Sequence, residues 1–410
     1  MRAEIKWPTK RLSELAEFRN GVNYNKSSFG KGIKVVGVSD FQNYTKPRYD
    51  ELDQINPEGI VTERNILHDG DIVFVRSNGN RELIGRSLFI EQPPEEVTHS
   101  AFTIRLRFNT RDVHPKFYAY CFRTPIIRQG LTASGGGTNI SNLNQDILNS
   151  LEVPFPPLPV QRRIADILSA YDELIENNQR RIRILEDMAR SLYRDWFVHF
   201  RYPGHESVPL TESTLGIIPQ GWEVKPFSAI ASYVNGYTFK PDDWGKDGKP
   251  IIKIKELKAG VTADTPRNIG DSIPTKFNIS DGDVLFSWSA DLDTYLWMGG
   301  EGLLNQHLFN VVPFEGFTRA FCFHALREVM PRFRALSLGA TMHHIKRSAL
   351  DQVFSAVPSA NLRRQFEILV DPIHKQLIAL TKQTANLRRT RDLLLPRLLS
   401  GSVVINKEKS

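Results

Sequence analysis

Arginine, asparagine and serine side chains are concentrated in a few loops of this sequence, next to glycine and aromatic residues. One loop follows the apolar run 71–75, and its candidate contact residues are Arg76, Ser77, Asn78, Arg81 and Arg86. The glycine-rich stretch 134–142 adds Thr138 and Asn139. Such side chains hydrogen-bond to base edges and to phosphate oxygens. The chemistry that they suit is nucleic-acid binding, and the plain alternative is that they are solvated loop residues without a partner.

The second half of the chain offers a comparable set. Its candidates are Ser287, Trp288 and Ser289 after an apolar run, and His343, His344, Lys346 and Arg347 in a later polar segment. Adjacent histidines on an extended segment point to opposite sides, and no Cys/His set completes a zinc site. We therefore interpret His343 and His344 as polar contact or surface residues. His307 fits a core or contact histidine, and nothing marks it as catalytic.

Motifs for nucleotide chemistry are missing. No Gly-x-x-x-x-Gly-Lys-Ser/Thr phosphate loop occurs. The run Gly135–Gly137 lacks both the preceding strand and the glycine spacing of a dinucleotide-binding turn. The Asn/Asp-Pro-Pro-aromatic motif of amino-methyltransferases is absent as well. A complete methyltransferase is not expected.

A nuclease centre would need carboxylates that hold a metal ion, commonly Pro-Asp followed by Asp/Glu-x-Lys. Pro241-Asp242 is followed by Lys253-Ile254-Lys255, in which a lysine replaces the required acid. Glu4-Ile5-Lys6 has no Pro-Asp before it. We expect no catalytic and no metal-binding residues in this chain.

The elements that position these loops occur twice. A segment that begins at Trp7 and closes on Asn20-Gly21 is repeated from Trp222 to Asn235-Gly236. Gly70–Phe74 is echoed by Gly282–Phe286, and the aromatic surroundings of Cys121 are echoed around Cys322. These repeated segments, which form the frame around the loops, agree between the two copies, whereas the loops differ in sequence. Two copies of one frame with different loops predict recognition of two different sequences.

Each copy is expected to be a mixed α/β globule. In the first copy, β-branched and aromatic runs predict strands at 33–38, 71–75, 87–90 and 102–108. Helices are expected around 10–18 and 115–131, the latter with Pro115 in its first turn. The proline-rich run 154–159 then ends the globule.

Each globule is followed by a long helical pattern, at 160–200 and at 361–400. Apolar residues step by threes and fours along both, as on the seam of a coiled coil. The expected seam residues of the first helix are Ile164, Ile167, Tyr171, Leu174, Asn178, Ile182, Leu185, Ala189, Leu192 and Trp196. Those of the second are Leu362, Phe366, Leu369, Ile373, Leu377, Leu380, Thr384, Leu387, Arg391, Leu394 and Leu398.

Forty helical residues rise about 60 Å. We expect the two helices to pair as an antiparallel coiled coil, with Asn178 helping to fix the register. Pro372 predicts a kink or a fresh helix start. Two ordinary core helices in separate domains are the alternative. The fold class is thus α/β (α+β), with two globules separated by two long helices in an internal pseudo-twofold repeat.

The expected domain boundaries follow from these patterns. They are a first globule at 1–157, a helical region at 158–202, a second globule at 203–357 with a linker at 203–221, and a helical region at 358–410.

Composition is that of an ordinary globular protein, with 40% hydrophobic and 24% charged residues among 410. The net charge of +7 favours polyanionic partners without proving one. No apolar run is long enough to span a membrane, and the N-terminus is unlike a signal peptide. Cys121 and Cys322 are expected to be buried and unpaired. We expect a cytoplasmic protein.

The chain resembles the specificity subunit of a Type I restriction–modification enzyme. The residues that carry the resemblance are Gly216–Trp222, the two Asn-Gly pairs, the Gly-Asp strands at 70–74 and 282–286, Pro156–Ala165 and Leu394–Gly401. Each motif is weak alone, but their order and duplication are specific, and the match spans essentially the whole chain. Pro372 and the basic end of the second helix (Arg388, Arg389, Arg391, Arg397) depart from the first copy.

The resemblance implies two target-recognition domains, each of which reads one half of a bipartite, asymmetric site in double-stranded DNA. It implies helices that space the domains and dock two methyltransferase subunits, with restriction subunits joining through the complex. The chain itself would bind no cofactor. S-adenosylmethionine, ATP and Mg²⁺ would be used by the partner subunits. The competing hypotheses are a coiled-coil scaffold that joins two protein-binding domains, and a stand-alone enzyme such as a single-chain nuclease.

Overall fold

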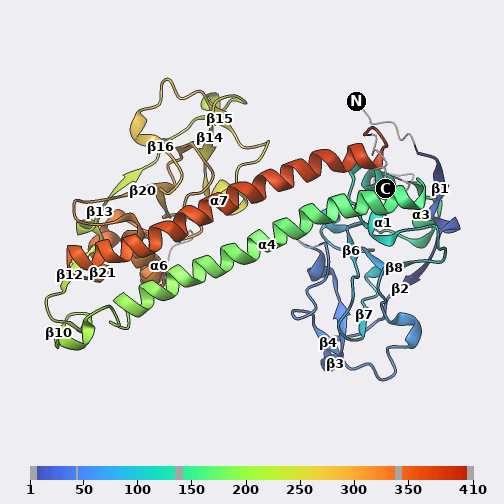
Figure 1. The fold of residues 1–410 in the computed structure, drawn as a ribbon, viewed down its shortest axis with the longest axis horizontal. Helices are drawn as coiled ribbons and strands as arrows, with labels where there is room; N and C mark the ends of the chain where they lie inside the picture. Colours follow the sequence, from blue (N-terminus) through green and yellow to red (C-terminus); the bar gives the residue numbers. More distant parts are fainter. Residues whose placement is uncertain (1–6, 43–44, 134–141, 338–343, 404–410) are drawn as a thin grey trace, which may run out of the picture. The chain divides into compact units, whose positions relative to one another are not determined.

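The computed structural model describes residues 7–42, 45–133, 142–337 and 344–403 (Figure 1). Two compact units divide the chain. Unit 1 comprises Met1–Glu173 and Leu387–Ser410, and unit 2 comprises Leu174–Asn386. Each unit therefore contains one globule together with a stretch of each long helix. The boundaries predicted at 157, 202 and 357 remain predictions.

Unit 1 contains two main sheets. The larger is antiparallel, with the order β2 (Ala16–Asn20), β8 (Thr103–Phe108), β5 (Ile72–Val75) and β6 (Ser87–Phe89). The smaller places β3 (Phe29–Val36) between β4 (Gln54–Ile55) and β7 (Val97–His99), and β3 runs parallel to β7. β1 (Thr9–Arg11) pairs with β9 (Glu152–Pro154). The helices are α1 (Pro115–Cys121), α2 (Pro125–Ala133) and α3 (Gln145–Ser150).

Unit 2 repeats this topology. Its larger sheet has the order β13 (Ala231–Asn235), β20 (Leu308–Pro313), β17 (Val284–Ser287) and β18 (Asp293–Leu296), again antiparallel. In its second sheet, β14 (Lys249–Ile252) runs parallel to β19 (Gly302–Leu304) and is flanked by β15 (Arg267–Asn268), with β16 (Asn278–Ile279) beyond β19. β12 (Glu223–Pro226) pairs with β21 (Phe354–Val357), and β10 (Leu210–Ser213) with β11 (Gly216–Pro219). The helices of this globule are α5 (Ile254–Ala259) and α6 (Arg319–Leu336).

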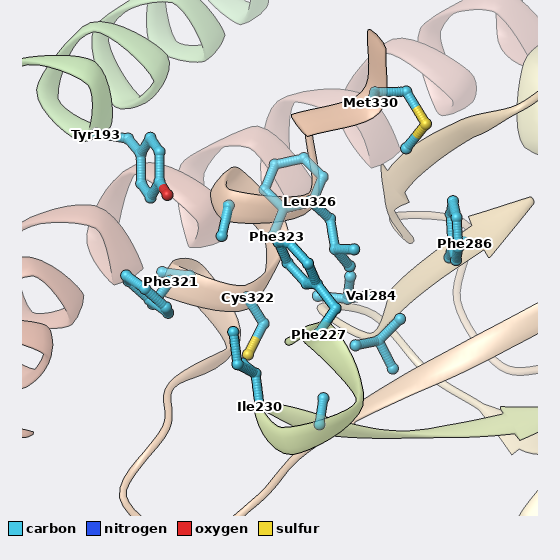
Figure 2. Packing of buried hydrophobic residues seen from close by; sticks show 14 of the residues in the cluster. Tyr193, Phe227, Ile230, Val284, Phe286, Phe321, Cys322, Phe323, Leu326 and Met330 are labelled. Atoms are coloured by element: carbon cyan, nitrogen blue, oxygen red, sulfur yellow. The ribbon is translucent and has the colours of Figure 1, made fainter. Parts of the chain in front are cut away.

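Strand β5 of the larger sheet in unit 1 and strand β17 of the larger sheet in unit 2 are buried on both faces. Side chains alternate along a strand, so Ile72 and Phe74 enter the core shared with α1, while Val73 and Val75 enter a second core. In unit 2, Phe286 packs in the core that contains residues of α6, and Leu285 packs in a second core. Figure 2 shows this α6 core, which Tyr193 of the first long helix also joins. The internal repeat predicted from sequence is thus confirmed in strand order and in packing.

Both Asn-Gly pairs end the first strand of the larger sheet, where two backbones approach closely. A Cβ atom on Gly21 would lie 2.2 Å from the carbonyl oxygen of His99, and one on Gly236 would lie 2.2 Å from that of Asn305. Both distances are far below contact distance, so glycine is required at these two positions. This requirement explains why the motif occurs in both copies.

The two long helices are α4 (Leu158–Phe197) and α7 (Ala360–Leu399). In unit 1 the first part of α4 meets the last part of α7, where Arg391 Nη1 donates to Asp172 Oδ1 over 2.6 Å. In unit 2 the last part of α4 meets the first part of α7, where the rings of Trp196 and Phe366 lie 6.0 Å apart. The antiparallel pairing predicted from the heptad pattern is confirmed.

Two expected seam positions are wrong. Leu174 and Leu369 are 49% and 48% exposed, whereas the next residues, Ile175 and Val370, are buried. The seam takes a step of four residues there where a step of three was assumed. Pro372 starts no new helix, because α7 continues through it with the proline ring exposed.

The expected helix around 10–18 is also wrong. This segment forms β1, a short 3₁₀ turn (Leu12–Glu14) and β2. Leu12 and Leu15 are buried at a helix-like spacing, but pairing of β2 with β8 determines the strand. The helix expected at 115–131 is divided into α1 and α2 at Pro125.

Cys121 and Cys322 are free and buried, as predicted. Burial raises the pKa of the Cys322 thiol to about 12. Among the described residues, no helix is both long and apolar enough to cross a membrane.

Candidate nucleic-acid interface

Three segments of unit 1 meet beyond the end of β5. The backbone N–H of Arg76 donates to the carbonyl oxygen of Phe102 over 2.8 Å. Ser77 forms an isolated antiparallel bridge with Asn142, and the N–H of Leu143 donates to the carbonyl oxygen of Arg76 over 2.8 Å. We call the set Arg76, Ser77, Phe102 and Asn142 the first junction. It brings the predicted loop after 71–75 next to the end of the glycine-rich stretch.

Unit 2 contains the same arrangement beyond the end of β17. Ser289 bridges to His344, and the N–H of Ile345 donates to the carbonyl oxygen of Trp288 over 2.8 Å. The Trp288 ring lies 5.7 Å from the ring of His307 and 5.9 Å from that of His344. We call the set Trp288, Ser289, His307 and His344 the second junction.

At the end of the first strand of each larger sheet, an asparagine side chain accepts a hydrogen bond at or near the junction. Asn20 Oδ1 accepts a hydrogen bond from Gln145 Nε2 over 3.3 Å. Asn235 Oδ1 accepts one from Trp288 Nε1 over 3.2 Å. The amides of the repeated Asn-Gly pairs therefore hold neighbouring residues of the two junctions.

The first junction borders an open pocket of about 440 Å³. The pocket is lined by Tyr24, Phe29, Ser77, Asn78 and Phe102, among others, and Phe102 is 61% exposed. Within the part of the chain that the structure describes, the Arg76 guanidinium has no hydrogen-bond or ion-pair partner. An exposed ring and polar side chains thus line the pocket, and the half-buried cation Arg76 directly precedes Ser77; such groups suit nucleic-acid binding.

A buried histidine lies behind the first junction. His99 Nδ1 lies 2.9 Å from Thr103 Oγ1. Burial, with a further contribution from Arg105 and Arg107, lowers the pKa of His99 to about 3. The imidazole is therefore neutral at physiological pH and acts as a fixed support for the segment that carries Phe102.

Several predicted contact residues have other surroundings. The Arg86 guanidinium donates to the backbone carbonyl oxygens of Phe41 and Gln42, which makes it a link between loops. Ser287 and Ser289 are buried, and Ser287 Oγ donates to the Ser289 carbonyl oxygen over 3.3 Å. Both side chains are thus buried, and the Ser287 hydroxyl stabilises the loop.

Of the remaining candidates, the structure describes the side chains of three and does not describe those of four. Asn78 is half-buried, and its Oδ1 accepts from the N–H of Asn80 over 2.6 Å. Lys346 and Arg347 are exposed directly after His344, at the start of a 3₁₀ turn (Arg347–Asp351). The residues Thr138, Asn139 and His343 and the side chain of Arg81 lie outside the described residues.

The sequence analysis did not nominate Phe102, included Asn142 only as the end of the glycine-rich stretch, and left His307 as a core or contact histidine. Phe102 and Asn142 are joined to a predicted loop through backbone contacts between segments distant in the sequence, and His307 through the contact of its ring with Trp288. The signal that could have found them is the repeat itself, because both copies place a different residue at the same point of the frame. Among the described residues, no three His, Cys, Asp or Glu side chains are grouped as metal ligands.

Comparison with known proteins agrees with this architecture. Residues 4–187 match the family model described as "Type I restriction modification DNA specificity domain". Over 98% of its length the chain is 24% identical to the Type I restriction enzyme MjaIX specificity subunit of Methanocaldococcus jannaschii, of which 94% is covered. It is 25% identical to the Type I restriction enzyme EcoKI specificity subunit of Escherichia coli K12, over 73% of this chain and 64% of the relative.

A solved structure shares the fold. The crystal structure of the Type I restriction–modification system S subunit from M. genitalium superposes with a TM-score of 0.63 at 15% identity, and the match covers 98% of this chain and 97% of that one. The fold is therefore the duplicated architecture of an S subunit. Residues 4–187 thus match a Type I restriction modification DNA specificity domain, and the chain is similar over nearly its whole length to a specificity subunit of a Type I restriction enzyme.

Proposed function

We propose that this chain is a specificity subunit of a Type I restriction–modification enzyme, that it is non-catalytic, and that it recognises a bipartite, asymmetric DNA site, each unit contacting one half. The observation that carries the proposal is that the two junctions share one backbone frame and differ in side chains. A shared frame presents side chains to DNA in the same way. Different side chains then select different bases.

The long helices are proposed to set the distance between the half-sites. Two contact points on one face of B-DNA lie about 34–36 Å apart, or a multiple of that distance. Forty helical residues, as in α4 and α7, rise about 60 Å, which is long enough to bridge one helical turn of DNA.

The same helices are proposed to dock two methyltransferase subunits. Unit 2 presents exposed apolar side chains on its stretches of both helices, namely Leu174, Ile184 and Met188 on α4 and Ile368 and Leu369 on α7. Exposed apolar side chains of this kind are candidates for a protein–protein contact. S-adenosylmethionine, ATP and Mg²⁺ would serve the methyltransferase and restriction subunits, and this chain would bind none of them. Work on DNA implies a cytoplasmic location.

Selection of bound duplexes from a random library, with the methyltransferase partner present, tests the proposal. The expected result is enrichment of one two-part motif with a fixed gap. Binding that stays sequence-independent and merely weakens with salt would contradict it, and would favour a scaffold that joins two protein-binding domains.

A further inference from the structure

The two junctions coincide position by position. In unit 1 the residue that follows β5, Arg76, accepts a backbone hydrogen bond from the N–H of Leu143, which lies in a third segment. In unit 2 the residue that follows β17, Trp288, accepts the corresponding bond from the N–H of Ile345. The next residue bridges to that third segment. In each unit the glycine of the Asn-Gly pair donates to the first residue of the last sheet strand, Thr103 over 3.3 Å or Leu308 over 3.0 Å.

These contacts align three positions of the frame. The residue before Thr103 is Phe102, and the residue before Leu308 is His307. The other aligned pairs are Arg76 with Trp288, and Asn142 with His344. At these positions the aligned backbone contacts correspond between the two units, and the side chains are chemically different.

The side chains of the first junction suit particular base edges. An arginine donates two hydrogen bonds to guanine O6 and N7, and an asparagine pairs with adenine N6 and N7. Phe102, with its exposed ring, offers an apolar surface for a thymine methyl group or for stacking. Asn142 is exposed as well and Arg76 is half-buried, so each of the three side chains has some surface that a ligand can reach.

The second junction has a different chemistry. Trp288 is fixed by Asn235, and the rings of His307 and His344 pack against it. The Nδ1 atoms of both histidines are buried and lack a hydrogen-bond partner among the described residues. Buried polar atoms are normally paired, so an occupant that supplies a partner would complete this cluster. A base edge has both donors and acceptors.

We infer that Arg76, Phe102 and Asn142 select the bases of one half-site, and that Trp288, His307 and His344 select those of the other. The inference rests on the proposed function and narrows it to six positions. Neither Phe102, Asn142 nor His307 carries a sequence motif that would mark it.

The test repeats the selection of bound duplexes with variants of the full chain in complex with the methyltransferase partner. Arg76→Gln removes the guanine-specific fork and supplies an amide that pairs with adenine. It is expected to change the preferred base at one position of one half-site, by about tenfold or more, and to leave the other half-site unchanged. His307→Asn is expected to change only the opposite half-site. The controls are Arg111→Gln, at an exposed residue beyond the other end of β8, and His199→Asn, at an exposed residue after α4.

The possible outcomes distinguish failure of the six-residue inference from failure of the proposed function. If the native chain selects a two-part motif, but the variants bind all sequences more weakly without a change of preference, the inference is wrong and the proposed function stands. If the native chain selects no motif, the proposed function fails and the inference with it. Arg76 and Asn142 are not packed in a core, so Arg76→Gln and Asn142→Ala decide the test even if His307→Asn fails to fold.

Discussion

Asn178 Nδ2 donates a hydrogen bond to Gln383 Oε1 over 3.2 Å and so joins α4 to α7 within unit 2. Asn178 is only 4% exposed and lies between apolar seam residues. A buried asparagine on such a seam stabilises one register of two helices at a cost in overall stability. The pair therefore supports the predicted role of Asn178.

Asn178→Leu is expected to leave stability unchanged or raise it by about 1 kcal/mol. A buried leucine gains roughly 1.5–3 kcal/mol of apolar burial, and the lost hydrogen bond is worth about 0.5–1.5 kcal/mol. Gln383 is exposed and can bond to water instead. Urea unfolding of the full chain checks this, with Leu174→Asn, at an exposed position, as the near-neutral control. A loss of more than about 1 kcal/mol would show that the hydrogen bond outweighs the burial.

Gly21→Ala is expected to destabilise unit 1 by about 2 kcal/mol or more, because the new methyl group would overlap the carbonyl oxygens of His99 and Ser100. Gly30→Ala is the matched control. A Cβ atom there meets no atom within 4 Å, and the backbone is not left-handed. Thermal unfolding of both variants makes the comparison. Equal midpoints would contradict the close approach of the two backbones.

Stability should fall in mild acid because of a buried histidine pair in unit 2. His324 Nε2 and His374 Nε2 lie 3.3 Å apart. Burial lowers the pKa of His324 to about 3, with smaller contributions from His374 and Arg327. Burial also lowers the pKa of His374 to about 4, and Asp371 slightly opposes this shift. Glu186 and Asp293 line the pocket beside them.

The direction of this pH dependence follows from the histidine pKa in the unfolded chain, which is near 6.5. Between pH 6.5 and about 4, the unfolded chain binds protons that the folded pair does not, so the free energy of unfolding decreases as the pH falls. The slope is at most about 1.4 kcal/mol per pH unit for each histidine. Urea unfolding between pH 7 and 4.5 measures it. His374→Gln should flatten the slope and His199→Gln, at an exposed position, should not; identical slopes would argue against the pair.

Deleting one heptad from α4 and the facing heptad from α7 is expected to shorten the DNA gap between the half-sites. Seven helical residues rise about 10 Å, which corresponds to about three base pairs at 3.4 Å each. Selection of bound duplexes reports the gap, and deleting a heptad from α4 alone is the control that should abolish pairing. An unchanged gap with both helices shortened would refute a spacing role for the helices.

Repetition made much of the fold predictable. The Asn-Gly pairs and Gly-Asp strands recur because Gly21 and Gly236 each face a carbonyl oxygen, and this requirement is local enough to be visible in sequence. Errors arose where a local pattern competes with tertiary pairing. The spacing of Leu12 and Leu15 fits a helix, yet the edge of β8 makes the following residues a strand.

The junctions were only half visible from sequence. Arg76 and Trp288 follow predicted strands directly, so residue type and position were sufficient to nominate them. Phe102 and Asn142 enter through backbone contacts between distant segments, which residue type does not indicate. Residue type also did not indicate that the Arg86 guanidinium donates to the backbone carbonyl oxygens of Phe41, Gln42 and Glu82.

Mapping N6-methyladenine across the host genome, with this gene intact and deleted, tests the central claim most directly. A subunit that directs methylation through two different half-sites predicts one asymmetric two-part motif with a fixed gap, methylated in the intact strain and unmethylated after deletion. Reintroducing the gene should restore methylation at that motif. A methylation map that is the same with and without the gene, while the methyltransferase partner is expressed, would contradict the account.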